Sequence, residues 1–263
     1  MSLQGYWSDQ KAPAFENLPS DLVVVQPVGA VEQHGPHLPL SVDCDLVEAV
    51  ITRGMSKLSA DQNVLILPTL TVTKSDEHDH FPGTLSLSAD TLLAKIRDIG
   101  ASLSRANIER LVFLNGHGGN AASLDITARD LRIQHDMIAA TASWFGFADY
   151  SAVEPEHILH DFHGGLIETS AMLATKPELV DMDLAENFEP ASMAWEQSYK
   201  FIGLTRQAAK PAWIAGDLHP KGVCGDAASA TVELGNQLLD SAARDFAAFL
   251  AEFARFDGRQ SEP

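Results

Sequence analysis

Short apolar runs alternate with longer segments of helical periodicity along most of this chain. The apolar runs occupy residues 22–28, 64–67, 110–114 and 137–143. Helical patterns occupy residues 44–58, 89–106, 120–134, 166–174 and 227–253. Apolar runs of this length are typical of buried strands. Their alternation with helices predicts an α/β fold with a mainly parallel sheet and helices on both of its faces.

The clearest helix is expected over residues 89–106. Its apolar residues Leu92, Ile96 and Leu103 recur at helical spacing and form one stripe that can be buried. Ser88 precedes the first turn, where a serine hydroxyl can accept a hydrogen bond from a free backbone amide. We therefore expect Ser88 to cap this helix.

One domain is expected over residues 1–263, because 45% of the residues are hydrophobic and α/β folds of this length often form a single core. Residues 181–220 are irregular and contain prolines at positions 190, 211 and 220. We interpret this segment as a lid or a subunit contact rather than a linker.

Acidic residues outnumber basic ones by 36 to 18, which gives a net charge of −18. Nucleic acids and anionic membranes attract basic surfaces, so neither is expected as a partner. Cys44 and Cys224 are far apart and are expected to be small buried hydrophobes. The N-terminus lacks the layout of a signal peptide, and no apolar run approaches the ~20 residues that span a bilayer. A cytoplasmic protein is therefore expected.

The segment EQHGPHLPLSVD, directly after the first apolar run, contains the densest set of chemical groups. Glu32 and His34 are two residues apart, and such residues point to the same side of an extended chain. Carboxylate and neutral imidazole groups are ligands for zinc, manganese or ferrous iron. Asp43 adds a further carboxylate, and His37 is expected either to orient a ligand or to touch substrate. The segment predicts a metal site.

A second polar loop, NGHGGN, follows the strand expected over residues 110–114. Parallel sheets bind ligands at the carboxyl ends of their strands, so His117 should share one sheet edge with Glu32 and His34. We interpret His117 as a third metal ligand. Asn120 is expected to cap the next helix.

A third cluster runs from His157 to Ser170. Glu168 opens an apolar helix, and a carboxylate buried there needs a partner such as a metal ion. His157, His160 and His163 would allow a separate histidine-rich metal site, but Pro155 and the two glycines at 164–165 favour a loop.

The fourth cluster, SDEHDHFPGT, follows the second apolar run and should lie on the same sheet edge. His78 and His80 alternate in a way that allows chelation of a metal. A polar loop that faces the substrate, with Glu77 and His78 on it, is the preferred interpretation.

Five motifs occur in an order that resembles the creatininase (creatinine amidohydrolase) family. They are EQHGPHLPLSVD, FPGTLSL, LNGHGGN, HGGLIETS and GVCGDAASAT, which span the chain from about Val25 to the final helix. The resemblance implies a three-layer α/β/α fold and a hydrolase that opens a C–N amide bond. It also implies two divalent metal ions per chain, with zinc favoured over manganese or iron, a small-molecule amide substrate, and a homo-oligomer, with a hexamer favoured.

The resemblance assigns roles to particular residues. One metal would be held by Glu32, Asp43 and His117, and the other by His34, Asp43 and Glu168, so that Asp43 bridges them. His163 matches the histidine that handles a proton near the substrate.

The chain departs from creatininase at positions near the substrate. Creatininase has a tyrosine and a metal-binding glutamate where this chain has Gly118 and Gly119. The tryptophan that covers creatinine aligns with Leu159, although Trp144 keeps a tryptophan after the fourth strand. Other family members, which keep the two glycines, deformylate a formamidopyrimidine or trim a modified peptide. A substrate other than creatinine is therefore expected, with creatinine, formamidopyrimidine and peptide activities as alternatives.

The expected mechanism combines the metals with His163 and Glu168 as catalytic residues. The metals would acidify a bridging water that attacks an amide carbonyl, and His163 would protonate the leaving nitrogen. The residues expected on the substrate side are His37, Glu77, His78, Gly118 and Trp144. Two rivals are a binding protein without activity on a hydrolase scaffold, and a single-metal enzyme in which Glu168 is the general base.

Overall fold

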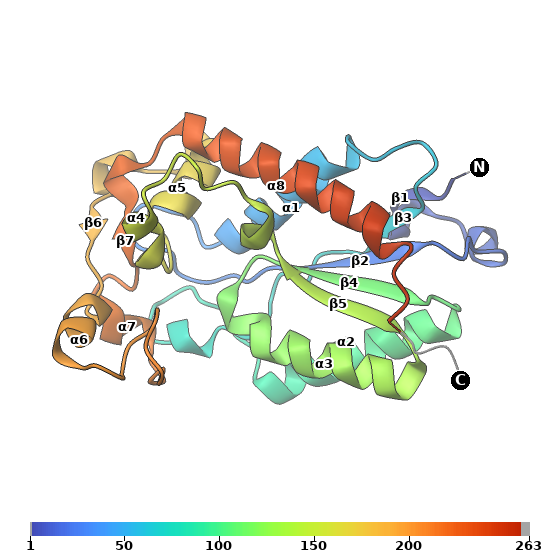
Figure 1. Ribbon diagram of the computed structural model, residues 1–263, viewed down its shortest axis with the longest axis horizontal. Coiled ribbons are helices and arrows are strands. Elements are labelled where there is room, and N and C mark those ends of the chain that lie inside the picture. The colour runs from blue at the N-terminus through green and yellow to red at the C-terminus, as the bar shows by residue number, and fades with distance from the viewer. Residues whose placement is uncertain (1, 259–263) are drawn as a thin grey trace.

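The computed structural model describes residues 2–258 and contains a five-stranded sheet in the order β1-β3-β2-β4-β5 (Figure 1). Its strands are β1 (Gln4–Tyr6), β2 (Val23–Val28), β3 (Val64–Ile66), β4 (Arg110–Asn115) and β5 (Ile138–Ser143). Each neighbouring pair is parallel, and β2 pairs with β4 along its whole length. The predicted parallel sheet and its four predicted strands are confirmed. The short edge strand β1 was not predicted.

Helices cover both faces of this sheet, which gives the predicted three-layer α/β/α arrangement (Figure 1). One layer contains α1 (Val42–Met55), α5 (Leu166–Leu173) and α8 (Val232–Phe253). The opposite layer contains α2 (Ala89–Arg105) and α3 (Ala121–His135). Val23 and Val25 of β2 belong to the core under the first layer, whereas Val24 and Val28 belong to the core under the second. The alternation of side chains along a strand therefore supplies both cores.

The starts of three helices agree with the sequence predictions to different degrees. Ser88 Oγ accepts a hydrogen bond from Thr91 N at 3.2 Å, so the predicted cap of α2 is confirmed. Asn120 lies at the start of α3, but its side chain accepts no capping hydrogen bond, and its amide nitrogen donates to Gly29 O at 3.1 Å. The expected helix 227–253 begins later, at Val232, after the separate 3-10 turn Ala227–Ser229.

The segment after β5 contains more regular secondary structure than its sequence predicted. The loop expected near His157 contains the short helix α4 (Pro155–Leu159), because Pro155 occupies the first turn, where its missing N–H is not needed. The irregular segment 181–220 contains α6 (Ser192–Ser198) and α7 (Ala215–Leu218). Its strand β6 (Asn187–Phe188) pairs antiparallel with β7 (Gly225–Asp226).

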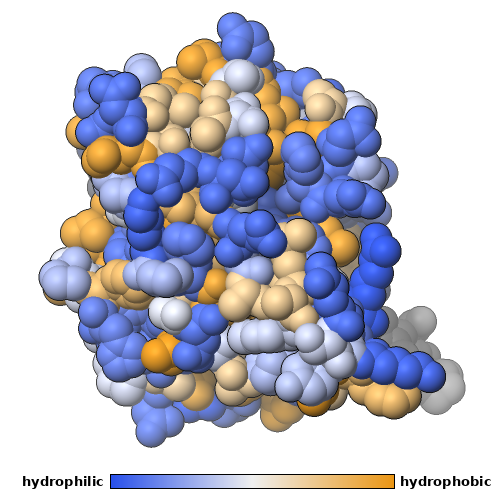
Figure 2. Space-filling model, turned by 90° about the vertical axis from the view of Figure 1, so that its left-hand side faces the viewer, coloured by the Kyte–Doolittle hydropathy of each residue, from blue (hydrophilic) through white to orange (hydrophobic). Residues whose placement is uncertain are grey.

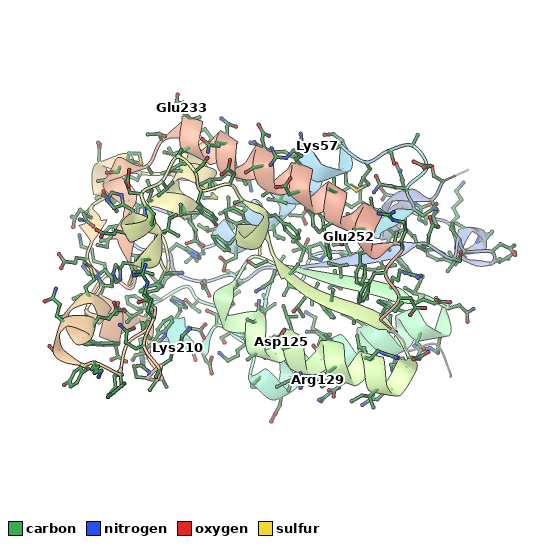
Figure 3. All side chains as sticks on the ribbon, viewed as in Figure 1. Lys57, Asp125, Arg129, Lys210, Glu233 and Glu252 are labelled. Carbon is green, nitrogen blue, oxygen red and sulfur yellow. The ribbon has the colours of Figure 1, made fainter. Side chains whose placement is uncertain are left out.

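The outer surface is largely polar. Charged residues labelled in Figure 3 project from the exposed sides of α8, α3 and the end of α1. The end that carries α6 and α7 shows intermixed hydrophilic and hydrophobic residues (Figure 2). Both cysteines are buried and unpaired, as expected. Among residues 2–258, no helix combines the length and the hydropathy that crossing a bilayer requires.

Candidate metal centre

Five residues from four separate segments meet at the carboxyl ends of the parallel strands. Glu32 and His34 follow β2, and His117 follows β4. Asp43 lies in the first turn of α1, and Glu168 lies in the first turn of α5. All five side chains are buried. The parallel topology brings them together, because parallel strands end at a common edge.

Asp43 is shared by two groups of potential ligands. One group is Glu32, Asp43 and His117, and the other is His34, Asp43 and Glu168. Within each group, the potential ligand atoms lie within 4.8 Å of one another. Asp43 Oδ1 lies 3.4 Å from His34 Nε2, and Asp43 Oδ2 lies 3.4 Å from His117 Nδ1. The two oxygens of one carboxylate therefore face two different histidines, which is the arrangement expected of a bridging ligand.

Unpartnered buried atoms indicate that these residues fit metal ions. Within the described part of the chain, Glu32 Oε1, His34 Nε2 and Asp43 Oδ2 are buried and have no hydrogen-bond partner. Burying such groups without partners costs free energy. Carboxylate oxygens and imidazole nitrogens are the types of atom that bind zinc, manganese or iron. The donor set of carboxylate oxygens and imidazole nitrogens therefore suits two such ions.

The pKa values of the ligands show the electrostatic conflict in this cluster. Burial, reinforced by Glu32, raises the pKa of Asp43 to about 7. Burial acts to lower the pKa of His34, but Asp43, Glu168 and Glu32 outweigh it and raise that pKa to about 9. Without metal ions, the buried carboxylates are compensated by protons, either on a carboxylate itself or on His34. Bound divalent cations would supply this positive charge instead.

Contacts behind the ligands fix their orientation. His34 Nδ1 lies 3.1 Å from Glu32 O, and Gly164 N donates to Glu168 Oε2 at 2.6 Å. Ser75 Oγ donates to Glu32 Oε2 at 2.5 Å. Such partners determine which nitrogen or oxygen a ligand presents to a metal.

His163 and His78 lie beside the ligand cluster. His163 Nδ1 and His78 Nε2 are each 3.6 Å from Glu32 Oε1. Burial, together with His34 and His78, lowers the pKa of His163 well below its ordinary value. Burial also lowers the pKa of His78 to about 4. Both rings are therefore neutral near pH 7. His163 also forms a ligand-like group with Glu32 and His34, so its geometry allows metal contact as well as proton transfer.

Two cavities open beside the cluster, and Phe162 and His163 line both. One has a volume of about 330 Å³ and reaches Asp43 and Glu168. The other has a volume of about 400 Å³ and is lined by residues that include Trp213. A substrate thus has room on two sides of His163.

The residues expected on the substrate side do not all lie there. Gly118 lines both cavities, and Glu77 and His78 line the second. His37 lines neither, because it is buried and its Nε2 contacts Thr169 Oγ1 at 2.9 Å. Trp144 is also absent from both linings.

The position of Trp144 corrects its expected contact with substrate. Its side chain is fully buried in the core and stacks on Phe145, with 4.1 Å between the ring centroids. Phe145 lines the first cavity in its place. A tryptophan after a strand end was a weak signal, because the turn Trp144–Phe147 buries its first residue and leaves the second at the cavity.

Sequence analysis missed several residues around the site. Gln33 contacts both His78 and His163. Its position between two proposed ligands in the sequence could have predicted a place in the site. Ser75 and Lys74 contact Glu32 and His117 from the polar loop after β3. His157, His160 and His80 belong to none of the potential metal-binding groups among the described residues.

Comparisons with known proteins agree with this geometry. The family model described as creatinine amidohydrolase matches residues 8–250. Creatinine amidohydrolase of Pseudomonas putida is 38% identical over 189 residues, which cover 65% of this chain and 71% of that protein. Mycofactocin precursor peptide peptidase of Mycobacterium ulcerans is 32% identical over 220 residues, which cover 82% and 79% of the two chains.

Solved structures show the same architecture. A mutant creatininase of Zn-Zn type superposes with a TM-score of 0.68 at 30% identity, covering 89% of this chain and 92% of the other. This chain therefore shares its fold with a creatininase described as being of Zn-Zn type.

Proposed function

Since this chain belongs to the creatininase family of hydrolases, which act on C–N bonds other than peptide bonds, we propose that it is a metal-dependent amidohydrolase that opens a cyclic amide or a formamide. The position of Asp43 carries this proposal, because its two oxygens face the two groups of potential ligands. Two divalent ions per chain, with zinc favoured, are part of the proposal.

The proposed ligands are Glu32, Asp43 and His117 for one ion and His34, Asp43 and Glu168 for the other. Ions bound there supply a Lewis acid for the amide carbonyl and lower the pKa of a bound water. The buried carboxylates of this chain fix where that chemistry occurs, because Ser75 holds Glu32 and the backbone N–H of Gly164 holds Glu168.

His163 is proposed to transfer the proton. Its Nε2 lies 2.7 Å from Gln33 O, so this nitrogen donates to the carbonyl and Nδ1 is free to accept. Nδ1 faces the ligand cluster, 3.6 Å from Glu32 Oε1. It can accept a proton from the attacking water and pass it to the leaving nitrogen, which a poor amine leaving group requires.

The cavity walls favour an uncharged or partly apolar amide. Phe145, Tyr150 and Phe162 contribute to the first cavity. Among the described residues that line either cavity, Lys74 is the single lysine or arginine, and it pairs with Asp76 and Glu77. A substrate carboxylate would therefore find no unpaired basic side chain in these walls.

Trimming of a peptide is a second candidate function. His163 lines both cavities, so an extended chain with its scissile amide at His163 has room on both sides of that residue. The similarity to the mycofactocin precursor peptide peptidase agrees with this candidate. Activity towards short peptides but not towards cyclic amides or formamides would favour it.

A homo-oligomer, with a hexamer favoured, is also proposed. Tyr199, Phe201 and Ile202 expose large apolar side chains near α6. Burial of such residues between subunits would remove apolar surface from water.

The experiment that tests the proposal is metal analysis of Asp43→Asn. One carboxylate is proposed to serve both ions, so the variant should lose both after dialysis, whereas the wild type should retain two per chain. Loss of amide hydrolysis should accompany the loss of metal. Retention of two ions by the variant would show that Asp43 is not the bridge, and one ion per wild-type chain would favour the single-metal rival.

A further inference from the structure

Gln33 lies between two proposed ligands, and its side chain contacts two histidines of the site. It is buried, with 5% of its surface exposed. Its orientation is fixed by the backbone, because Gly35 N donates to Gln33 Oε1 at 2.9 Å and Gln33 Nε2 donates to Gly222 O at 2.6 Å. Exchanging the amide nitrogen and oxygen would break both hydrogen bonds.

Gly222 makes this close approach possible. Its φ is +72°, and a Cβ at this position would lie 2.6 Å from Gln33 Nε2. Only glycine brings its carbonyl to the amide here without a clash.

The orientation of Gln33 determines the proton position on His78. One Nε2 hydrogen of Gln33 goes to Gly222 O, and the second points to His78 Nδ1 at 2.8 Å. His78 Nδ1 must accept this hydrogen, so a neutral His78 carries its own proton on Nε2. That nitrogen faces Glu32 Oε1 at 3.6 Å and presents an N–H to the site.

The backbone of Gln33 determines the proton position on His163, but there the nitrogen that faces the site is left without a proton. A carbonyl can only accept, so His163 Nε2, 2.7 Å from Gln33 O, carries the proton. His163 Nδ1 then presents a lone pair, also 3.6 Å from Glu32 Oε1. The 3.3 Å contact between Gln33 Nε2 and His163 Nε2 joins two donors and is not a hydrogen bond in this arrangement.

We propose that Gln33 is a positioning residue that makes His78 a hydrogen-bond donor and His163 a hydrogen-bond acceptor toward the same point in the site. Both rings line the second cavity, and their centroids are 4.3 Å apart, so one amide bound in that cavity can meet both. The catalytic value of this pair rests on the proposed function, but the two proton positions do not.

The pair supplies a balanced proton path for amide hydrolysis. His163 Nδ1 takes one proton from the attacking water as the new C–O bond forms, and His78 Nε2–H donates a hydrogen bond to the substrate without losing its proton. When the C–N bond breaks, its electron pair stays on nitrogen, which takes the proton from His163. Both rings return to their starting proton positions.

Nitrogen-15 magic-angle-spinning NMR of histidine-labelled, zinc-loaded protein tests this proposal. In the wild type, His78 and His163 should both be protonated at Nε2, with signals assigned by their loss in His78→Gln and His163→Gln. In Gln33→Met, which removes the amide but keeps the length, His78 should become a mixture of both neutral forms. His163 should not change, because its partner is a backbone carbonyl.

Gln26→Met is the matched control. Gln26 is also buried, and its amide donates to Pro27 O and Pro68 O without contacting a histidine. This variant should leave both histidine patterns unchanged. Gln33→Met should retain zinc and lose about 10- to 100-fold in rate, a part of what positioned acid–base groups contribute.

A wild-type His78 protonated at Nδ1, or an unchanged His78 pattern in Gln33→Met, would overturn the proposal. The wild-type spectrum decides the first point even if Gln33→Met fails to fold. A protein without amidohydrolase activity but with the expected spectra would reject the proposed function and retain the positioning role of Gln33.

Discussion

Both ring nitrogens of His117 contact other groups, Nδ1 on the side of the proposed metal site and Nε2 on the opposite side. Nδ1 lies 3.1 Å from Glu32 Oε1 and faces the ligand cluster. Nε2 lies 2.9 Å from Lys74 O and 3.3 Å from Glu77 Oε1. A carboxylate and a carbonyl on the outer nitrogen fix which nitrogen a histidine offers to a metal. Glu77 therefore acts behind His117 in this structure, although it also lines the second cavity.

Gly119 makes room for the Glu77 carboxylate. A Cβ at this position would lie 1.9 Å from Glu77 Oε1 and 2.4 Å from His117 Nε2. We predict that Gly119→Ala displaces Glu77 and weakens zinc binding by about 10- to 100-fold, the usual loss when a partner of a ligand is removed. Competition with a chelator measures this affinity. Gly118→Ala is the control, because nothing lies within 4 Å of a Cβ there. Equal zinc affinity in both variants would contradict the prediction.

His37 should make the metal-free protein sensitive to mild acid. Burial lowers its pKa to about 4, below the ordinary value of about 6.5. The unfolded chain thus binds a proton before the folded chain does, so stability present above pH 6.5 is lost as the pH falls towards 4. Between pH 7 and pH 5 the loss should be about 2 kcal/mol of unfolding free energy.

Denaturant unfolding of EDTA-treated protein at pH 7 and pH 5 measures this effect. His37→Gln removes the titrating group and keeps a polar partner for Thr169, so its loss between the two pH values should be smaller by that amount. An identical pH dependence in the wild type and the variant would show that His37 is not responsible.

At the scale of elements, the sequence predicts the strands and helices that bury an apolar face. It does not predict features that depend on contacts between distant segments. The four predicted strands and the helix α2 follow from apolar runs and from the Ser88 cap. The edge strand Gln4–Tyr6 has no apolar run and exists because it pairs with β3. Asn120 has the chemistry of a cap, but its side chain serves Gly29 across the fold instead. Ligand loops could be predicted because strand ends share an edge, whereas the partners behind them depend on packing.

The closest contact between α5 and α8 lies near one of the proposed ligands. Gly235 of α8 approaches α5 so closely that a Cβ would lie 1.9 Å from Ser170 O, two residues beyond Glu168. We predict that Gly235→Ala separates the helices, destabilises the protein by about 1–3 kcal/mol and weakens metal binding through Glu168. Thermal unfolding and zinc titration measure the two effects.

Gly54→Ala is the control for this prediction. Gly54 lies on α1 against α8, where the nearest atom to a Cβ would be Ala243 O at 3.4 Å. Gly54→Ala should not destabilise the protein, because the contact is nearly ordinary and alanine favours a helix by about 1 kcal/mol over glycine. Zinc binding should stay unchanged. If Gly235→Ala is as stable and binds zinc as tightly as Gly54→Ala, the close contact does not position Glu168.

At the scale of the whole molecule, the fold brings the proposed ligands together from distant segments, and the walls of the two cavities come from further segments of the chain. Five motifs in order were enough to predict the family, and the residues proposed as ligands do lie together around Asp43. The walls were less predictable, because Phe145 rather than Trp144 faces the cavity, and Trp213 comes from the segment 181–220. Substrate preference therefore has to be argued from the cavities.

Creatinine should be a poor substrate for this protein. Gly118 lines both cavities and Gly119 accommodates the Glu77 carboxylate, so neither position offers a side chain to a small ring. Leu159 lies in α4 and lines neither of the two cavities beside the metal ligands. A ring as small as creatinine would leave much of these cavities unfilled and lose contacts in the transition state.

We predict that kcat/KM for creatinine is at least ~100-fold below that for the preferred amide, which corresponds to about 3 kcal/mol of transition-state binding. Zinc-loaded protein should be tested against creatinine, formamides, formamidopyrimidine nucleotides, lactams and short peptides, with Asp43→Asn as the inactive control. A kcat/KM for creatinine within ~100-fold of that for the best amide would contradict the prediction. It would mean that the Phe145 and Phe162 side of the site closes around a small ring without an aromatic residue at position 118 or an acidic residue at position 119.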